Sequence, residues 1–234
     1  MKKIVCLDFD GVLCDSIDEC LLVAYNTFFG RLDKKLKYVS EDIKQYFYSY
    51  RYLVRRAGGY FLIFKAFEIG MHLLDYKSFR LLERKYNGEL LEFEELFFKV
   101  RNELKKNGST WLLLHRLYPN AFEFIKNYRN RFFIITTKDY DSVERLSKHF
   151  NYYNKIIKIY SKEISSDKRY MFKKLIKLYS YDPSNTELIY VDDNVEHLES
   201  LRDLNINLFF ATWGCSKVSD EKQFNAIKNL MEIV

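Results

Sequence analysis

Four short apolar runs, each followed by polar residues, constrain the fold of this chain more than any other feature. The runs cover Lys3–Asp10, Arg131–Thr136, Glu187–Val191 and Asn207–Ala211. Runs this short and this rich in β-branched and aromatic residues are typical of buried strands. Helical patterns separate the later runs, over Tyr140–Phe150, Lys168–Tyr179 and Val195–Leu204. This alternation predicts an α/β core in which helices cover both faces of a Rossmann-like parallel sheet.

The pattern changes between Ser16 and Tyr118, where no comparable strand occurs. Apolar residues recur there at spacings of three and four, as in Leu21, Leu22, Tyr25, Phe28 and Phe29. Such spacing is typical of amphipathic helices. The sequence therefore predicts an all-helical domain over residues 17–118, inserted into an α/β core formed by residues 1–16 and 119–234.

Composition and targeting signals indicate a packed protein of the cytoplasm. Hydrophobic residues make up 48% of the chain, well above the level at which chains stay disordered. The first apolar run contains Asp8 and Asp10, which the core of a secretory signal would exclude. The longest apolar stretch, Tyr60–Leu74, is interrupted by two charges and is shorter than the ~20 residues of a membrane span. We expect no membrane association and reduced cysteine thiols.

Two carboxylates end the first run. Asp8 and Asp10 are two residues apart, so a strand would direct both to the same side. One carboxylate can attack a phosphoryl group, and the other can protonate the leaving oxygen and later activate water. Gly11 follows and would let the backbone approach a bound phosphate closely. Taken alone, the pair could instead cap loop amides.

The other strand ends add polar groups to the same edge of the sheet, because parallel strands direct their carboxyl ends to one side. Asp192 and Asp193 would bring up to four carboxylates together, a cluster that Mg²⁺ would stabilise. The same two residues could also form an ordinary turn and a helix N-cap. Thr136, or its neighbour Thr137, can donate a hydroxyl to phosphate, and Lys168 can neutralise the remaining charge.

These residues resemble a known family. The run from Asp8 to Ser16, DFDGVLCDS, is similar to the first signature of the haloacid dehalogenase superfamily, in its phosphoglycolate-phosphatase-like branch. Ile134–Lys138 resembles the second signature, Lys168 the third, and Tyr190–Asn194 the fourth. The resemblance covers residues 1–16 and 119–214, and the inserted helices correspond in position to a cap domain.

The resemblance implies a magnesium-dependent phosphatase that hydrolyses a small phosphate monoester through an aspartyl phosphate. Asp8 would be the nucleophile and Asp10 the general acid and base. Thr136 and Lys168 would bind the phosphate. Asp193, Asp8 and the backbone carbonyl of Asp10 would hold the magnesium ion.

Two signatures depart from the family pattern. Arg169 follows Lys168 where the third signature has proline, which leaves three other lysines as alternatives, namely Lys162, Lys173 and Lys174. His197 stands where the fourth signature has a second acid, and Asp192 is a candidate to replace that acid as a metal ligand.

Other functions and partners remain open at this stage. A sugar phosphomutase would use the same residues, and a phosphate-binding regulatory module could keep the fold without turnover, although retention of both Asp8 and Asp10 argues against the module. We expect a small phosphorylated metabolite as partner. Ile43–Phe67 contains five basic and no acidic residues. Its nine aromatics are explained more simply as the core of the inserted domain than as a nucleic-acid surface.

Overall fold

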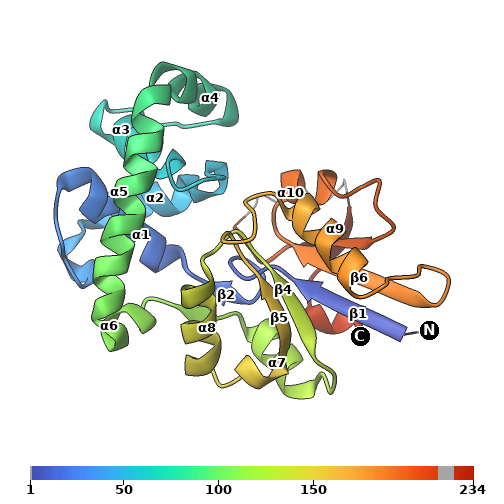
Figure 1. Cartoon of the computed structure of the whole chain (residues 1–234). Coiled ribbons are helices and arrows are strands. Elements are labelled where there is room, and N and C mark those ends of the chain that lie inside the picture. Colours follow the sequence, from blue (N-terminus) through green and yellow to red (C-terminus); the bar gives the residue numbers. More distant parts are fainter. Residues whose placement is uncertain (1, 216–223) are drawn as a thin grey trace. The chain divides into compact units, whose positions relative to one another are not determined.

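The chain divides into two compact units (Figure 1). The structure is a computed structural model that describes residues 2–215 and 224–234. One unit joins the chain up to Asp15 with the chain from Arg116 onward, and the other comprises Ser16–His115. The first unit is discontinuous in sequence, because the second is inserted between Asp15 and Arg116.

The discontinuous unit is built on a sheet of six strands in the order β5-β4-β1-β6-β7-β8, in which every neighbouring pair is parallel. The strands are β1 (Lys2–Leu7), β4 (Phe132–Ile135), β5 (Ile156–Tyr160), β6 (Thr186–Asp192), β7 (Asn207–Ala211) and β8 (Asn225–Ile227). The first strand of the chain is therefore central, with β4 on one side and β6 on the other. A separate two-stranded ladder pairs β2 (Cys14–Asp15) with β3 (Arg116–Leu117), where the chain leaves and re-enters this unit.

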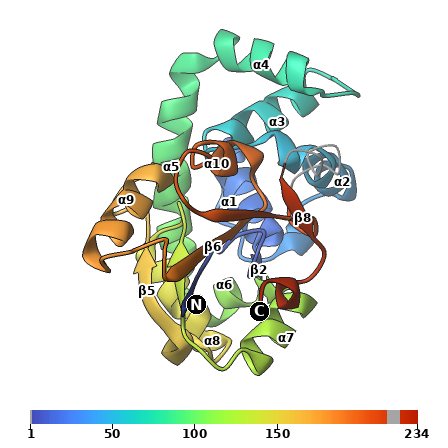
Figure 2. The same cartoon turned by 90° about the vertical axis from the view of Figure 1, so that its right-hand side faces the viewer.

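Helices complete the α/β unit. They are α7 (Pro119–Asn127), α8 (Tyr140–His149), α9 (Lys168–Leu178), α10 (Val195–Glu199) and the short 3₁₀ helices η3 (Tyr153–Lys155) and η5 (Leu230–Ile233). Buried side chains of α9 and α10, such as Phe172 and Leu198, share one hydrophobic cluster with the strand residues Cys6 and Tyr190. Figure 2 shows η5, at the C-terminus, beside α7.

The predicted fold class is confirmed, since the chain forms a parallel α/β sheet with a helical insertion. The sheet has two more strands than predicted. β5 was not predicted because it lies at an edge and carries an exposed lysine, Lys158, that interrupts its apolar residues. β8 has three residues, too few for a periodic pattern. The helix predicted to reach Leu204 ends earlier, at Glu199.

The second unit consists of helices. They are α1 (Ile17–Phe29), η1 (Leu36–Tyr38), α2 (Glu41–Tyr50), η2 (Arg51–Leu53), α3 (Gly59–Glu68), α4 (Tyr76–Lys85), α5 (Asn87–Lys106) and α6 (Gly108–Leu112). Aromatic rings join them, because Tyr60 of α3 stacks on Phe47 of α2 and on Phe97 of α5, each at a centroid distance of 5.4 Å. Aromatics of the basic segment thus form the core of this unit. Over the described residues, no helix combines the length and the apolar character needed to cross a membrane.

A buried ion pair joins the first and the longest helix of this unit. Arg101 of α5 donates two hydrogen bonds of 2.7 Å to the Glu19 carboxylate of α1, and Trp111 Nε1 donates a third at 3.2 Å. Glu19 is fully buried. Because an ion pair in this environment must offset the loss of hydration, its main effect is to fix which faces of the two helices meet.

Candidate active site

The sheet topology brings three polar strand ends together. The strand order reverses at β1, since the chain continues to β4 on one side and to β6 on the other. Ligands of open parallel sheets bind outside the carboxyl ends of the strands at such a switch point. Asp8 follows β1 directly, Thr136 follows β4, and Asp192 is the last residue of β6.

Asp8 is a buried carboxylate with one oxygen engaged. Its backbone N–H donates to Val191 O at 2.9 Å, and its Oδ2 lies 3.0 Å from Lys168 Nζ. Its Oδ1 is buried and accepts no hydrogen bond from the described part of the chain. Burial raises the pKa of Asp8 well above its ordinary value, and the neighbouring Asp192 and Asp193 add to this against the opposing effect of Lys168. Positive charge in addition to that of Lys168 would therefore favour the ionised form of Asp8.

Lys168 lies at the first turn of α9, where Asp167 caps the helix by accepting the N–H of Arg169. Its ammonium lies 2.7 Å from Asp192 Oδ2 and donates to the Tyr190 hydroxyl at 2.9 Å, in addition to its contact with Asp8. Burial alone would lower the pKa of Lys168, but the carboxylates of Asp192 and Asp8 outweigh it and raise that pKa. Of the alternative lysines, Lys173 and Lys174 are exposed and Lys162 is half-buried. Lys168 is the lysine that the fold brings to Asp8.

Asp192 is occupied by hydrogen-bond donors. The Tyr190 hydroxyl donates to its Oδ2 at 2.6 Å, in addition to Lys168, and His197 Nδ1 lies 3.1 Å from the same oxygen. Asn194 N–H donates to Oδ1 at 2.9 Å. Burial would raise the pKa of Asp192, but Lys168 and His197 hold it below the usual range. The carboxylate is ionised, and both of its oxygens already accept hydrogen bonds.

Asp193 lies between two glycines. A Cβ atom at Gly11 would lie 2.3 Å from Asp193 Oδ2, and a Cβ atom at Gly214 would lie 2.3 Å from Asp193 Cβ. Gly11 also has a φ of +86°, a conformation that side chains disfavour. Cys215 N–H donates to Asp193 Oδ2 at 2.6 Å. The space beside Gly11, which we expected a phosphate to use, holds the Asp193 carboxylate.

The remaining expected residues lie around a turn after β4. Thr136 is buried and its Oγ1 accepts the N–H of Lys138 at 3.1 Å, which leaves its own hydroxyl proton to donate elsewhere. Thr137 is exposed. Lys138 Nζ lies 3.0 and 3.1 Å from the two carboxylate oxygens of Asp10.

Three residues of this site were not predicted from the sequence to have a role in it, namely Lys138, Tyr190 and His197. Lys138 directly follows the two threonines at a strand end. This position was the one sequence feature that could have indicated a role for Lys138 in the site. Tyr190 lies inside a buried strand, where an aromatic residue is expected for packing alone. The sequence therefore gives no sign of its hydrogen bond to Asp192.

One group of residues at this site could bind a metal ion. Asp8, Asp192 and His197 each offer a ligand atom, and these atoms lie within 4.8 Å of one another. The buried and unsatisfied Asp8 Oδ1 fits a cation, and so does the crowding of Asp8, Asp192 and Asp193. Asp192 is the poorer ligand of the three carboxylates, because its oxygens already accept hydrogen bonds.

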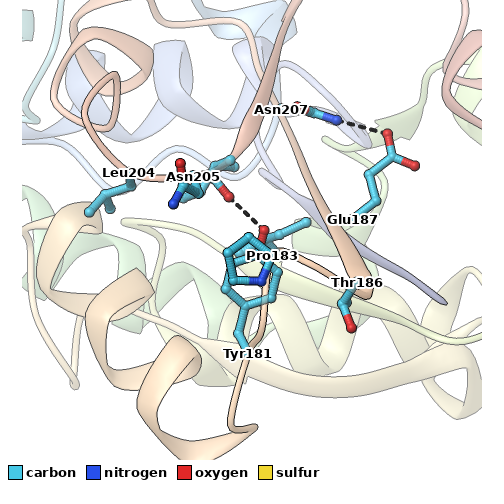
Figure 3. A pocket seen from close by; sticks show the side chains of 9 residues that line it. Tyr181, Pro183, Thr186, Glu187, Leu204, Asn205 and Asn207 are labelled. Carbon is cyan, nitrogen blue, oxygen red and sulfur yellow. Dashed lines mark hydrogen bonds between the residues drawn. The ribbon is translucent and has the colours of Figure 1, made fainter. Parts of the chain in front are cut away.

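A hollow lies at the amino ends of the strands, opposite the ends that carry Asp8 and Asp192 (Figure 3). It has a volume of about 400 Å³ and is lined by residues at the amino ends of β6 and β7, including Tyr181, Glu187, Asn205 and Asn207. Its polar groups bond to one another, since Tyr181 donates to Asn205 O and Asn207 donates to Glu187. Among the described residues that line it, Glu187 is the one carboxylate. The cluster of ionisable groups is at the other end of the strands.

Comparisons with known proteins identify the architecture. A family model described as haloacid dehalogenase-like hydrolase matches residues 2–205. A haloacid dehalogenase-like hydrolase of Bacteroides fragilis superposes with a TM-score of 0.67 at 14% identity over 100% of both chains. A predicted phosphoglycolate phosphatase of Haemophilus somnus gives 0.64 at 14% identity, over 99% of this chain and 96% of that one. A hydrolase of Streptococcus pneumoniae gives 0.58 at 17% identity, over 100% and 96%. A search of curated protein sequences found no match.

Proposed function

The chain belongs to the haloacid dehalogenase-like hydrolases, and from this premise we propose that it is a magnesium-dependent phosphatase acting on a small phosphate monoester. The observation that carries the proposal is the buried Asp8 at the switch point of the sheet. Lys168 holds its Oδ2, and its Oδ1 is buried without a hydrogen bond from the described residues. The similar fold of the Haemophilus somnus protein, described as a predicted phosphoglycolate phosphatase, supports a phosphate ester as substrate.

In the first step, an Asp8 oxygen attacks the phosphorus atom and forms an aspartyl phosphate. The bond from phosphorus to the ester oxygen breaks, and Asp10 donates a proton to that oxygen, so the product leaves as an alcohol. The Thr136 hydroxyl and the Lys168 ammonium bind the phosphoryl oxygens. Both groups are available to do so, because Thr136 keeps its proton and Lys168 is charged.

In the second step, water hydrolyses the aspartyl phosphate. Asp10, now ionised, takes a proton from the water, whose oxygen bonds to phosphorus as the bond to Asp8 breaks. Inorganic phosphate leaves, and Asp10 has regained the proton that it needs for the next turnover. Asp10 suits both tasks, because its side chain is 34% exposed and accessible to water, whereas Asp8 is buried.

The Mg²⁺ ion would be held by Asp8, Asp193 and the backbone carbonyl of Asp10. When bound, it supplies positive charge that offsets the repulsion between the carboxylates and the anionic substrate. We assign Asp192 a different task, which is to hold Lys168 beside Asp8. The donors that already occupy both Asp192 oxygens support this division.

The test is phosphate release from a panel of sugar phosphates, nucleotides, phosphoglycolate and aryl phosphates, with and without Mg²⁺. We expect magnesium-dependent release by the wild type and a loss of about 10³-fold or more in Asp8→Asn. Asp42→Asn, which changes an exposed carboxylate of α2, is the matched control and should match the wild type. Interconversion of sugar phosphates without net release would identify a phosphomutase instead. Binding of phosphate without any turnover would identify a regulatory module.

A further inference from the structure

We propose that Lys138 is a positioning residue that orients the Asp10 carboxylate for proton transfer to the leaving oxygen. This inference rests on the proposed function, in which Asp10 is the general acid. Its basis is the two-point contact in which Lys138 Nζ lies 3.0 Å from Asp10 Oδ1 and 3.1 Å from Oδ2. No feature of the local sequence joins the two residues, which come from the loops after β1 and β4.

The backbone around Lys138 is held on both sides. Its N–H donates to Thr136 Oγ1 at 3.1 Å, and its carbonyl accepts the N–H of Lys162, after β5, at 3.3 Å. The next residue, Asp139, caps α8 by accepting the N–H of Ser142 at 2.9 Å. The ammonium therefore extends from a fixed turn, as a positioning group must.

The burial of the two partners is unequal. The Lys138 side chain is 1% exposed, whereas that of Asp10 is 34% exposed. A buried ammonium is strongly stabilised by a carboxylate in contact with it, and Asp10 supplies one. Asp10 in turn keeps an accessible side, on which an ester oxygen or a water molecule can approach.

The contact with Lys138 restricts the rotation of the Asp10 carboxylate about its last side-chain torsion. Rotation of an aspartate carboxylate about its last torsion has broad, shallow minima, so an isolated Asp10 would sample many orientations. Contact of one ammonium with both oxygens selects one plane for the carboxylate. Proton transfer requires the donor and the acceptor to be aligned within hydrogen-bond reach, so this selection affects the rate directly.

A lysine at this edge of the sheet could instead bind the phosphoryl group itself. The two roles give different results when the leaving group is varied. Removal of a residue that binds the phosphoryl group should lower kcat/KM by a similar factor for every ester. A residue that acts through Asp10 matters most for alkyl esters, whose poor leaving group needs a proton, and least for p-nitrophenyl phosphate, whose leaving group departs as an anion.

The experiment compares kcat/KM for phosphoglycolate and p-nitrophenyl phosphate, because kcat/KM covers the steps up to leaving-group departure. For Lys138→Met we expect a loss of about 10²-fold with phosphoglycolate and under about 10-fold with p-nitrophenyl phosphate. Lys138→Arg keeps a charged donor and should restore part of the loss. In an Asp10→Asn background, Lys138→Met should change kcat/KM by less than about 2-fold, because the group that it orients is gone.

Lys174→Met removes an exposed lysine of α9 and is the matched control. Urea unfolding checks that each variant is folded, and Lys138→Gln replaces Lys138→Met if the methionine variant is not. Equal losses with both substrates, or additive effects of Lys138→Met and Asp10→Asn, would overturn the role of Lys138 and leave the phosphatase intact. No phosphate release by the wild type from any substrate would overturn both proposals.

Discussion

A methyl group at position 214 would test the position of Asp193 directly. Gly214→Ala adds one carbon atom beside that carboxylate, at a backbone position outside the left-handed region in which a side chain is strained. The effect of the substitution is therefore steric. The new Cβ would lie 2.3 Å from Asp193 Cβ, 2.5 Å from Oδ2 and 2.6 Å from Cγ.

The size of the effect follows from these distances. Carbon atoms in contact are normally about 3.5–4.0 Å apart, so Asp193 or the loop must move by roughly 1 Å. The closest atom, Asp193 Cβ, belongs to the base of the side chain, so a rotation of the carboxylate alone does not relieve the overlap. Overpacking of this kind costs about 1–3 kcal/mol in the free energy of unfolding. Because metal–ligand distances tolerate only about 0.2 Å, we expect Mg²⁺ affinity to fall about 10-fold to 100-fold.

Three measurements check this prediction, namely calorimetric Mg²⁺ binding, the Mg²⁺ concentration for half-maximal phosphate release, and urea unfolding. The control is Gly88→Ala in α5, where an added Cβ has no heavy atom within 4 Å. This substitution should leave Mg²⁺ binding unchanged and stabilise the chain by up to about 1 kcal/mol. Wild-type Mg²⁺ affinity and unfolding free energy in Gly214→Ala would refute our description of Asp193 between its two glycines.

Three further outcomes are expected. Mg²⁺ at about 100 times its Kd should raise the free energy of unfolding by about 2.7 kcal/mol, measured by thermal unfolding with and without EDTA. Asp8→Asn, which changes a proposed ligand, should reduce this gain. Asp192→Asn should lower kcat about 10²-fold by releasing Lys168 while leaving Mg²⁺ affinity within about 3-fold, and a large loss of affinity would make Asp192 a ligand. Arg101→Met should cost about 3–5 kcal/mol in urea unfolding, because it removes the guanidinium that donates two hydrogen bonds to the buried Glu19 carboxylate, and the added change Glu19→Gln should recover part of that cost.

The sequence predicts the strands that carry the chemistry better than those at the edges of the sheet. β1, β4 and β6 are central, and each contains four consecutive apolar residues, so each run is easy to recognise. The edge strands β5 and β8 have exposed positions that interrupt or shorten their apolar runs, and their pairing depends on neighbours distant in sequence. A periodic pattern contains no information about such neighbours.

The same limit applies inside the site. The sequence indicates that Asp8 and Thr136 come together, because the carboxyl ends of parallel strands meet at one side of a sheet, and the family resemblance adds Lys168 to them. The sequence could not assign different tasks to Asp192 and Asp193, which are adjacent in the chain. Their surroundings differ, because Asp192 points toward Lys168 and Tyr190 whereas Asp193 lies between two glycines.

The central position of β1 has a consequence for synthesis of the protein on the ribosome. Leu7 of β1 pairs with Val191 of β6. β1, the first strand to be synthesised, therefore cannot complete its pairing until β6 has been synthesised. At ~5–20 residues per second the interval is roughly 10–40 s. The inserted helices, whose contacts are nearer in sequence, can fold within that time. Both edges of β1 are unpaired until β4 has been synthesised, and the edge that pairs with β6 stays unpaired for the whole interval, so the yield of folded protein in a cell should depend on how well that edge is shielded from other chains.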